Sequence, residues 1–136
     1  MIDNEAIVFE KVSEALRAEF EGIFITGTEL MDTPPQFPAV SIVQTNSEVN
    51  KKYSTFEKVD NVASETYKFD IYSNLESQKD AKQQTKDIVA VVDGVMSGLF
   101  YPRTFCQPVA NADAKIARRV ARYTKTNVTQ EVMNYG

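Results

Sequence analysis

The chain contains no histidine and no tryptophan, and only one of its 136 residues is a cysteine. Without histidine, the sequence excludes Ser-His-Asp catalysis, histidine-activated thiols and the common histidine-containing zinc sites. Cys106 has no second cysteine with which to form a disulfide inside the chain. A free cysteine without such partners is usually a small buried side chain. We therefore interpret Cys106 as part of a strand and not as a nucleophile.

Glycine is also scarce, at five residues. Phosphate-binding loops need closely spaced glycines, and the dinucleotide-binding, P-loop, nucleophile-elbow and zinc-protease motifs are all missing from the sequence. No pair of acidic residues has a spacing that indicates a carboxylate metal site. The sequence therefore predicts a protein that is not an enzyme, with no catalytic residues, no metal and no cofactor.

Long apolar runs are missing as well, since none approaches the roughly 18 residues that a membrane-spanning helix needs. The first residues are acidic, whereas a secretory signal starts with basic residues and continues with an apolar core. Hydrophobic residues make up 43% and charged residues 25% of the chain, which is typical of a folded domain. We expect one soluble domain over residues 1–136, in a cytoplasm and without a membrane partner.

Hydrophobic spacing predicts two amphipathic helices. The first begins at Asp3 or Asn4 and ends near Gly22, which suits a left-handed helix stop. The second begins after the cap Ser77 and ends near Leu99. Their apolar positions recur at three- and four-residue steps, so each helix packs through one face.

Short β-type runs are predicted at 23–26, 39–45, 64–73 and 103–109. The run 64–73 alternates strictly, with Tyr67, Phe69 and Ile71 on one face and residues such as Lys68 and Asp70 on the other. This alternation predicts a buried side and a solvent-facing side, as in antiparallel sheets. The fold class is therefore α+β, with a small, mainly antiparallel sheet, two helices packed on one face, and an extended loop or hairpin arm.

The predicted arm is the polar stretch from Asn46 to Asn61. Loops longer than about 12 residues in compact domains are usually functional or disordered. Large side chains in such an arm suit contact with another subunit, or they fold back onto their own core. The candidate interface residues of the arm are Lys51, Lys52, Tyr53 and Phe56.

The stretch 111–125 places five cations in a chain whose net charge is −4. Whether this stretch forms a helix or a strand, it carries Arg118, Arg119 and Arg122 as candidate contact residues. The threonine-rich continuation favours a strand for its second half. The arginines suit acidic surfaces of a neighbouring subunit, so we predict Arg118, Arg119 and Arg122 at a subunit interface. A nucleic-acid surface and a simply solvated face are the alternatives. The first usually needs a basic domain with aromatic groups, and only Tyr123 lies inside the run.

Three features occur together in a particular order. An alternating strand from Ser64 to Tyr72 leads into a capped helix that starts Ser-Gln-Lys-Asp-Ala at Ser77, and a final strand reads Ile-Ala-Arg-Arg-Val-Ala-Arg-Tyr from Ile116 to Tyr123. This order resembles the tail terminator or tail-completion proteins of long-tailed bacteriophages, which also occur in prophages as minor capsid proteins. The resemblance extends from the first helix to Tyr123.

The resemblance implies a virion structural protein whose copies form a ring, as a homohexamer, at the head–tail junction. Such a ring caps the tail tube, ends its polymerisation and joins it to head connector proteins, after assembly in the host cytoplasm. DNA passes through the lumen without sequence-specific binding, and an acidic lumen lets it slide. A head-closure or adaptor ring of the same connector is the alternative, and a small nucleic-acid-binding module is a second one.

Overall fold

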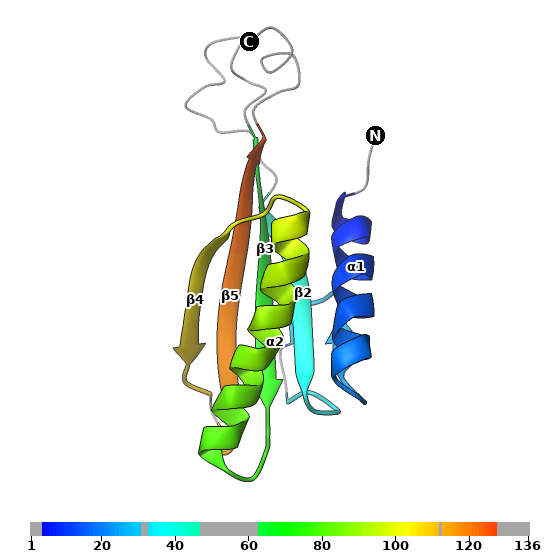
Figure 1. Ribbon diagram of the computed structural model, residues 1–136. Coiled ribbons are helices and arrows are strands. Elements are labelled where there is room, and N and C mark those ends of the chain that lie inside the picture. Colours follow the sequence, from blue (N-terminus) through cyan, green and yellow to red (C-terminus); the bar gives the residue numbers. More distant parts are fainter. Residues whose placement is uncertain (1–3, 31–32, 47–62, 112, 128–136) are drawn as a thin grey trace, which may run out of the picture.

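The computed structural model describes residues 4–30, 33–46, 63–111 and 113–127, and these form a five-stranded sheet with two helices (Figure 1). The strand order is β1-β2-β3-β5-β4. All neighbouring pairs are antiparallel except β1 and β2, which are parallel. The predicted α+β class and the predicted order of elements are confirmed. The elements are α1 (Asn4–Glu19), β1 (Phe24–Thr26), β2 (Ala39–Asn46), β3 (Ala63–Ser73), α2 (Gln78–Gly98), β4 (Arg103–Val109) and β5 (Ala117–Asn127).

Both helices pack on one face of the sheet, which we call the helical face (Figure 1). Each helix buries the stripe that its hydrophobic spacing predicts, and the alternating residues of β3 lie beneath them. Because these side chains are almost fully buried, they supply most of the apolar area that stabilises the domain. The central members of this core are Val8, Val12, Leu16, Tyr67, Phe69, Ile71, Ile88, Val92 and Met96.

The helix ends follow the capping chemistry of the sequence, with one exception. Ser77 caps α2, since its hydroxyl accepts a hydrogen bond from the backbone N–H of Asp80. Gly22 follows α1 with a φ of 74°, as predicted for a left-handed stop. After α2, however, the residue in the left-handed region is Phe100, with a φ of 67°. For a residue other than glycine that conformation costs roughly 1–2 kcal/mol.

The two longest strands, β3 and β5, extend past both helices at one end of the sheet (Figure 1). At this end Ala63 pairs with Asn127, and Asn46 of β2 pairs with Thr66 close by. The predicted arm begins at Asn46, but residues 47–61 lie outside the described residues, and so do its four candidate interface residues. The structure therefore places the start of the predicted arm at the end of the sheet where β3 and β5 project.

We call the opposite face of the sheet the outer face. Alternation along β3 predicts that this face is exposed to solvent, but part of it is covered. Asp70 is only 2% exposed. The chain between β1 and β2 crosses this face, where the Ser41 hydroxyl donates to the carbonyl oxygen of Thr28 at 2.8 Å. A second apolar cluster forms there around Tyr72 and Ile116. The prediction of a solvated side is thus wrong for this part of β3, because a connection between two other strands covers it.

Buried tyrosines make the domain sensitive to alkaline pH. Burial is the main cause that raises the pKa of Tyr67 well above its ordinary value of 10.0, and burial likewise raises the pKa of Tyr101 to about 12. Both rings are almost fully buried and meet edge to face. The folded state therefore holds these protons more tightly than the unfolded chain does, and this stabilisation is complete below pH 10.

We expect the free energy of unfolding to fall as the pH rises from 10 towards 12, because the unfolded chain loses these protons first. Urea unfolding followed by circular dichroism at pH 9, 10 and 11 measures the effect. Tyr101→Phe should reduce the slope of the free energy against pH in this range. An unchanged slope in that variant would contradict the assignment.

Candidate functional site

The predicted basic interface lies on β5, in the interior of the sheet between β3 and β4. Residues 114–115 form a turn, and the strand begins at Ala117, so all three candidate arginines are strand residues. The strand alternative is therefore correct for the whole arginine run. Alternation places Arg118 and Arg122 on the outer face and Arg119 on the helical face. The three arginines do not form one patch.

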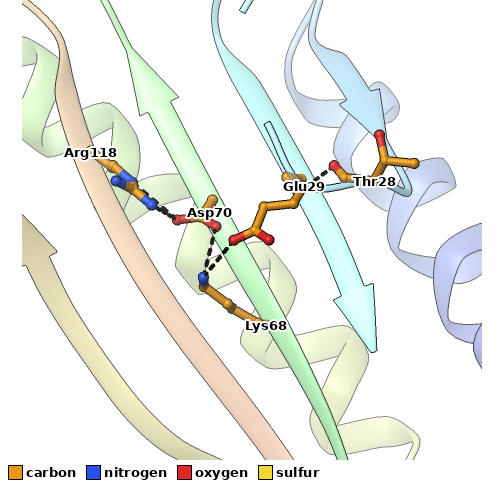
Figure 2. A network of polar contacts seen from close by, with 6 residues as sticks. Thr28, Glu29, Lys68, Asp70 and Arg118 are labelled. Carbon is orange, nitrogen blue, oxygen red and sulfur yellow. Dashed lines mark hydrogen bonds and ion pairs between the residues drawn. The ribbon is translucent and has the colours of Figure 1, made fainter. Parts of the chain in front are cut away.

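Asp70 is the centre of a polar network on the outer face, and Arg118 lies at one end of it (Figure 2). The Nε and Nη2 of Arg118 both donate to Oδ1 of Asp70, at 3.1 and 2.7 Å. The Nζ of Lys68 lies 3.6 Å from the other Asp70 oxygen and 3.3 Å from Oε1 of Glu29. The network thus joins β3, β5 and the connection between β1 and β2. The Lys68–Glu29 pair and the hydrogen bond from Ser41 to Thr28 both link that connection to the sheet.

The buried carboxylate of Asp70 supplies the counter-charge for the half-buried guanidinium of Arg118. Burial lowers the pKa of Arg118, but the hydrogen bonds that Arg118 donates to Asp70 and the charge of that carboxylate outweigh burial and raise the pKa above its ordinary value. The guanidinium also lies 5.5 Å from the centre of the Tyr72 ring. Arginine suits such a place, because its planar group can pair with a carboxylate and stack on an aromatic ring together. Arg118 is therefore committed to contacts within its own chain.

Arg119 and Arg122 differ from Arg118 in having no carboxylate partner among the described residues. The Nε of Arg119 donates to the hydroxyl of Thr85 on α2, at 3.2 Å, and its Nη1 lies 4.0 Å from the sulfur of Cys106. Arg122 is exposed, and its guanidinium lies 4.8 Å from the centre of the Phe105 ring on β4. Arg122 is thus the candidate arginine most accessible to another molecule.

Tyr123 does not offer the stacking surface that nucleic-acid binding through the basic run requires. Its side chain is 1% exposed, its ring packs edge to face on Phe69, and its hydroxyl donates to Asp93 of α2. Burial first, and then the hydrogen bond to Asp93, raise the pKa of Tyr123 well above its ordinary value. The aromatic residue inside the basic run is a core residue.

Cavities of about 230, 300 and 480 Å³ open on the described part of the molecule. The smallest lies between the first turns of α2 and the adjoining ends of β4 and β5, where Lys82 and Arg119 line it. The larger two lie on either side of the N-terminal half of α1. Within the described residues, no group of three or more histidine, cysteine or acidic side chains is placed to hold a metal ion.

Sequence reasoning missed the residues that make the network. Asp70 and Lys68 look like ordinary solvent-facing positions of an alternating strand, and Glu29 lies in a connection without a motif. Only the tertiary fold brings Glu29, which follows β1 in the sequence, to Lys68 on β3. The sequence contains one signal that could have identified Asp70. It stands among the β-branched and aromatic residues of a central strand, where a buried charge needs a partner.

Comparison with known proteins adds no assignment: no protein-family model matches the chain, and no curated protein matches it. Among the described helices, neither is long and apolar enough to cross a membrane.

Proposed function

We propose that this chain is a virion structural protein of a long-tailed phage or prophage, and that it acts as the tail terminator. Copies of the chain form a ring, as a hexamer, that caps the tail tube, ends its polymerisation and connects it to the head connector. The function depends on docking of copies and not on a reaction. The support comes from the resemblance to that family, which extends from the first helix to Tyr123, and from a fold whose surfaces suit association.

The observation that best supports the proposal is the free edge of β4. This strand pairs with β5 on one side and has no strand on its other side in the described chain. Most of its residues are exposed. An unpaired edge strand is a ready site for pairing with another chain. Pro108 lacks a backbone N–H, so an added strand would bond to residues 103–107.

The projecting end of β3 and β5 supports the proposal in a second way. The predicted arm begins at this end, at Asn46, and the final described strand also ends there. Lys51, Lys52, Tyr53 and Phe56 belong to that arm, and their place at a subunit interface stays a prediction. An acidic chain, with 19 acidic and 15 basic residues, also suits a lumen through which DNA slides without being held.

The test is a tube-length assay with the tail tube protein of the phage or prophage that carries the gene of this chain. Purified chain is added while that protein polymerises, and tube lengths are measured by electron microscopy. We expect growth to stop, with short tubes that carry a ring of this chain at one end. Tubes of unchanged length at a molar excess of the chain would contradict the proposal.

A single substitution on the outer face probes the predicted basic interface. Arg122→Glu should leave the thermal unfolding temperature unchanged, because Arg122 is exposed and pairs with no carboxylate among the residues that the structure describes. We expect it to abolish capping through repulsion from acidic neighbouring surfaces. Arg17→Glu, an exposed arginine on α1, is the matched control and should cap normally. Normal capping by Arg122→Glu would remove Arg122 from the interface.

Two other functions give different results in the same experiments. A head-closure or adaptor ring would assemble on the head connector and leave tube length unchanged. A small nucleic-acid-binding module would be retained on duplex DNA as a monomer, with affinity that falls steeply with salt. The buried position of Tyr123 and the pairing of Arg118 with Asp70 argue against the second of these.

A further inference from the structure

Phe100 occupies a position where glycine is the usual residue. The backbone N–H of Phe100 bonds to the carbonyl of Ser97, and that of Tyr101 bonds to the carbonyl of Met96. This is the Schellman arrangement that ends helices, and its left-handed residue is usually glycine because a side chain is strained there. The sequence places Gly98 two residues earlier, inside the helix. The strained position therefore holds an aromatic side chain.

The fold gains little from that side chain. Phe100 is 75% exposed, which is far more than the other exposed large apolar residues, Ile7 at 39% and Leu75 at 42%. Its ring faces the Nζ of Lys125 at 5.9 Å. A strained backbone that presents an exposed aromatic ring is a feature that binding sites retain at the expense of stability.

Phe100 and Lys125 form one side of a surface that we call the Phe100 patch, together with Ile7 and Leu99 around a hollow of about 300 Å³. The Nζ of Lys125 also lies 4.8 Å from the centre of the Tyr101 ring and 3.3 Å from the carbonyl oxygen of Leu99. The patch thus combines a protruding aromatic ring with one positive charge.

A pocket of the opposite character lies on the other flank of α1. It has a volume of about 480 Å³ and is the largest of the three cavities. Glu5 and Glu10 supply its charges, and neither forms an ion pair with another described residue. Apolar groups fill the remainder of its wall. This acidic pocket is lined by Glu5, Ala6, Phe9, Glu10, Gly27 and Ile42.

We propose that the Phe100 patch of one copy docks into the acidic pocket of the next copy. The Phe100 ring enters the apolar part of the pocket, and Lys125 faces Glu5 and Glu10. Charge complementarity identifies a second copy as the occupant, since the same chain carries both the basic patch and the acidic pocket. This inference rests on the proposed function, because it names one contact between neighbouring subunits of the ring.

The positions of the two surfaces make the contact head to tail. The patch and the pocket use different sides of α1, because successive helix residues are rotated by about 100°. Ile7 lies on the side of the patch, and the side of the pocket carries Glu5, Ala6, Phe9 and Glu10. The patch and the pocket of one molecule therefore serve two different neighbours. A repeated contact of this kind closes into a ring or continues as a filament.

Phe100→Gly separates docking from folding, because it removes the ring and relieves the strained backbone. We expect its unfolding temperature to rise by about 3 °C and its self-association, measured by sedimentation velocity, to weaken at least about tenfold. Leu75→Ser, which removes an exposed apolar side chain elsewhere, is the control and should associate like the unchanged chain. Equal association of Phe100→Gly and the unchanged chain would overturn the inference.

A mixing experiment tests the head-to-tail pairing. A second variant, Glu5→Lys with Glu10→Lys, keeps the patch and reverses the charge of the pocket, so it should be monomeric at concentrations where Phe100→Gly is monomeric. An equimolar mixture should form a one-to-one dimer that grows no further, with the patch of the second variant in the intact pocket of the first. Two variants that stay monomeric when mixed would overturn the pairing.

The outcomes separate this inference from the proposed function. An unchanged chain that is monomeric at every concentration would overturn docking to a second copy. So would a Phe100→Gly variant that associates normally but fails to bind the tail tube protein. In either case the tube-length assay still decides the proposed function. If Phe100→Gly still forms a ring that caps the tubes, the terminator function is supported and this contact between subunits is ruled out.

Discussion

Replacing Asp70 with asparagine should lower the free energy of unfolding by about 3 kcal/mol, because the change leaves Arg118 and Lys68 without their buried counter-charge. Asparagine keeps the shape of the side chain and an oxygen that can accept from Arg118, so the loss reports the charge. We choose the lower end of the range for broken buried pairs because the Arg118 side chain is 25% exposed. Urea unfolding at neutral pH measures the difference.

The exposed pair of Arg103 and Asp93 provides the matched control. Its atoms are 2.9 Å apart, but its side chains are 44% and 38% exposed. Arg103→Gln should therefore change the free energy of unfolding by less than about 1 kcal/mol. If Asp70→Asn also falls within that range, the network does not hold the outer face together.

A double-mutant cycle with Arg118→Met shows where the cost of losing Asp70 arises. If the loss comes from an unpaired guanidinium, Asp70→Asn should cost much less in the Arg118→Met background than in the unchanged chain. Equal costs in both backgrounds would assign the effect to Lys68 or to packing.

Replacing Tyr123 with alanine should lower the free energy of unfolding by about 3–5 kcal/mol. The ring is 1% exposed, and it contacts Phe69 edge to face with ring centres 5.4 Å apart. The hydroxyl also binds Asp93, so this single side chain connects β5, β3 and α2. Its removal leaves a cavity between the sheet and α2. Thermal unfolding of the variant beside the unchanged chain measures the loss.

Tyr123→Phe is the control that separates the ring from the hydroxyl. It keeps the packing and removes only the hydrogen bond to Asp93, so we expect a loss of about 1.5–3 kcal/mol, as for bonds to charged groups. Its stability should also fall less steeply above pH 10, since one proton with a raised pKa is gone. If Tyr123→Phe and Tyr123→Ala lower the free energy of unfolding equally, the ring contributes nothing to stability.

The same residue shows how a local pattern can suggest the wrong role. In the sequence, Tyr123 stands among arginines and lysines and is the aromatic group that a nucleic-acid surface would use. In the structure its strand lies between β3 and β4, and the alternation turns its ring to the helical face. Whether a strand residue reaches solvent depends on which layer covers its face, and the residues of the strand do not encode that layer.

The helices and strands follow from local chemistry. Stripes at three- and four-residue spacing, the Ser77 cap, the Gly22 stop and the alternation of β3 are properties of neighbouring residues, and they predict the elements in their correct order. The absence of histidine and the scarcity of glycine likewise exclude whole classes of chemistry without a structure. These inferences need no information about distant contacts.

Local patterns in the chain are therefore sufficient to predict the α+β class, the order of the elements and the positions that fill the core. The folded domain is needed to see that Arg118, Arg119 and Arg122 face different surroundings, that Glu29 reaches Lys68 over the sheet, and that Phe100 protrudes beside Lys125. The physical reason is that burial and ion pairing depend on residues far apart in the chain. Residue spacing within a segment specifies which face of a helix or strand is apolar. The packing of the whole domain determines which residues that face contacts.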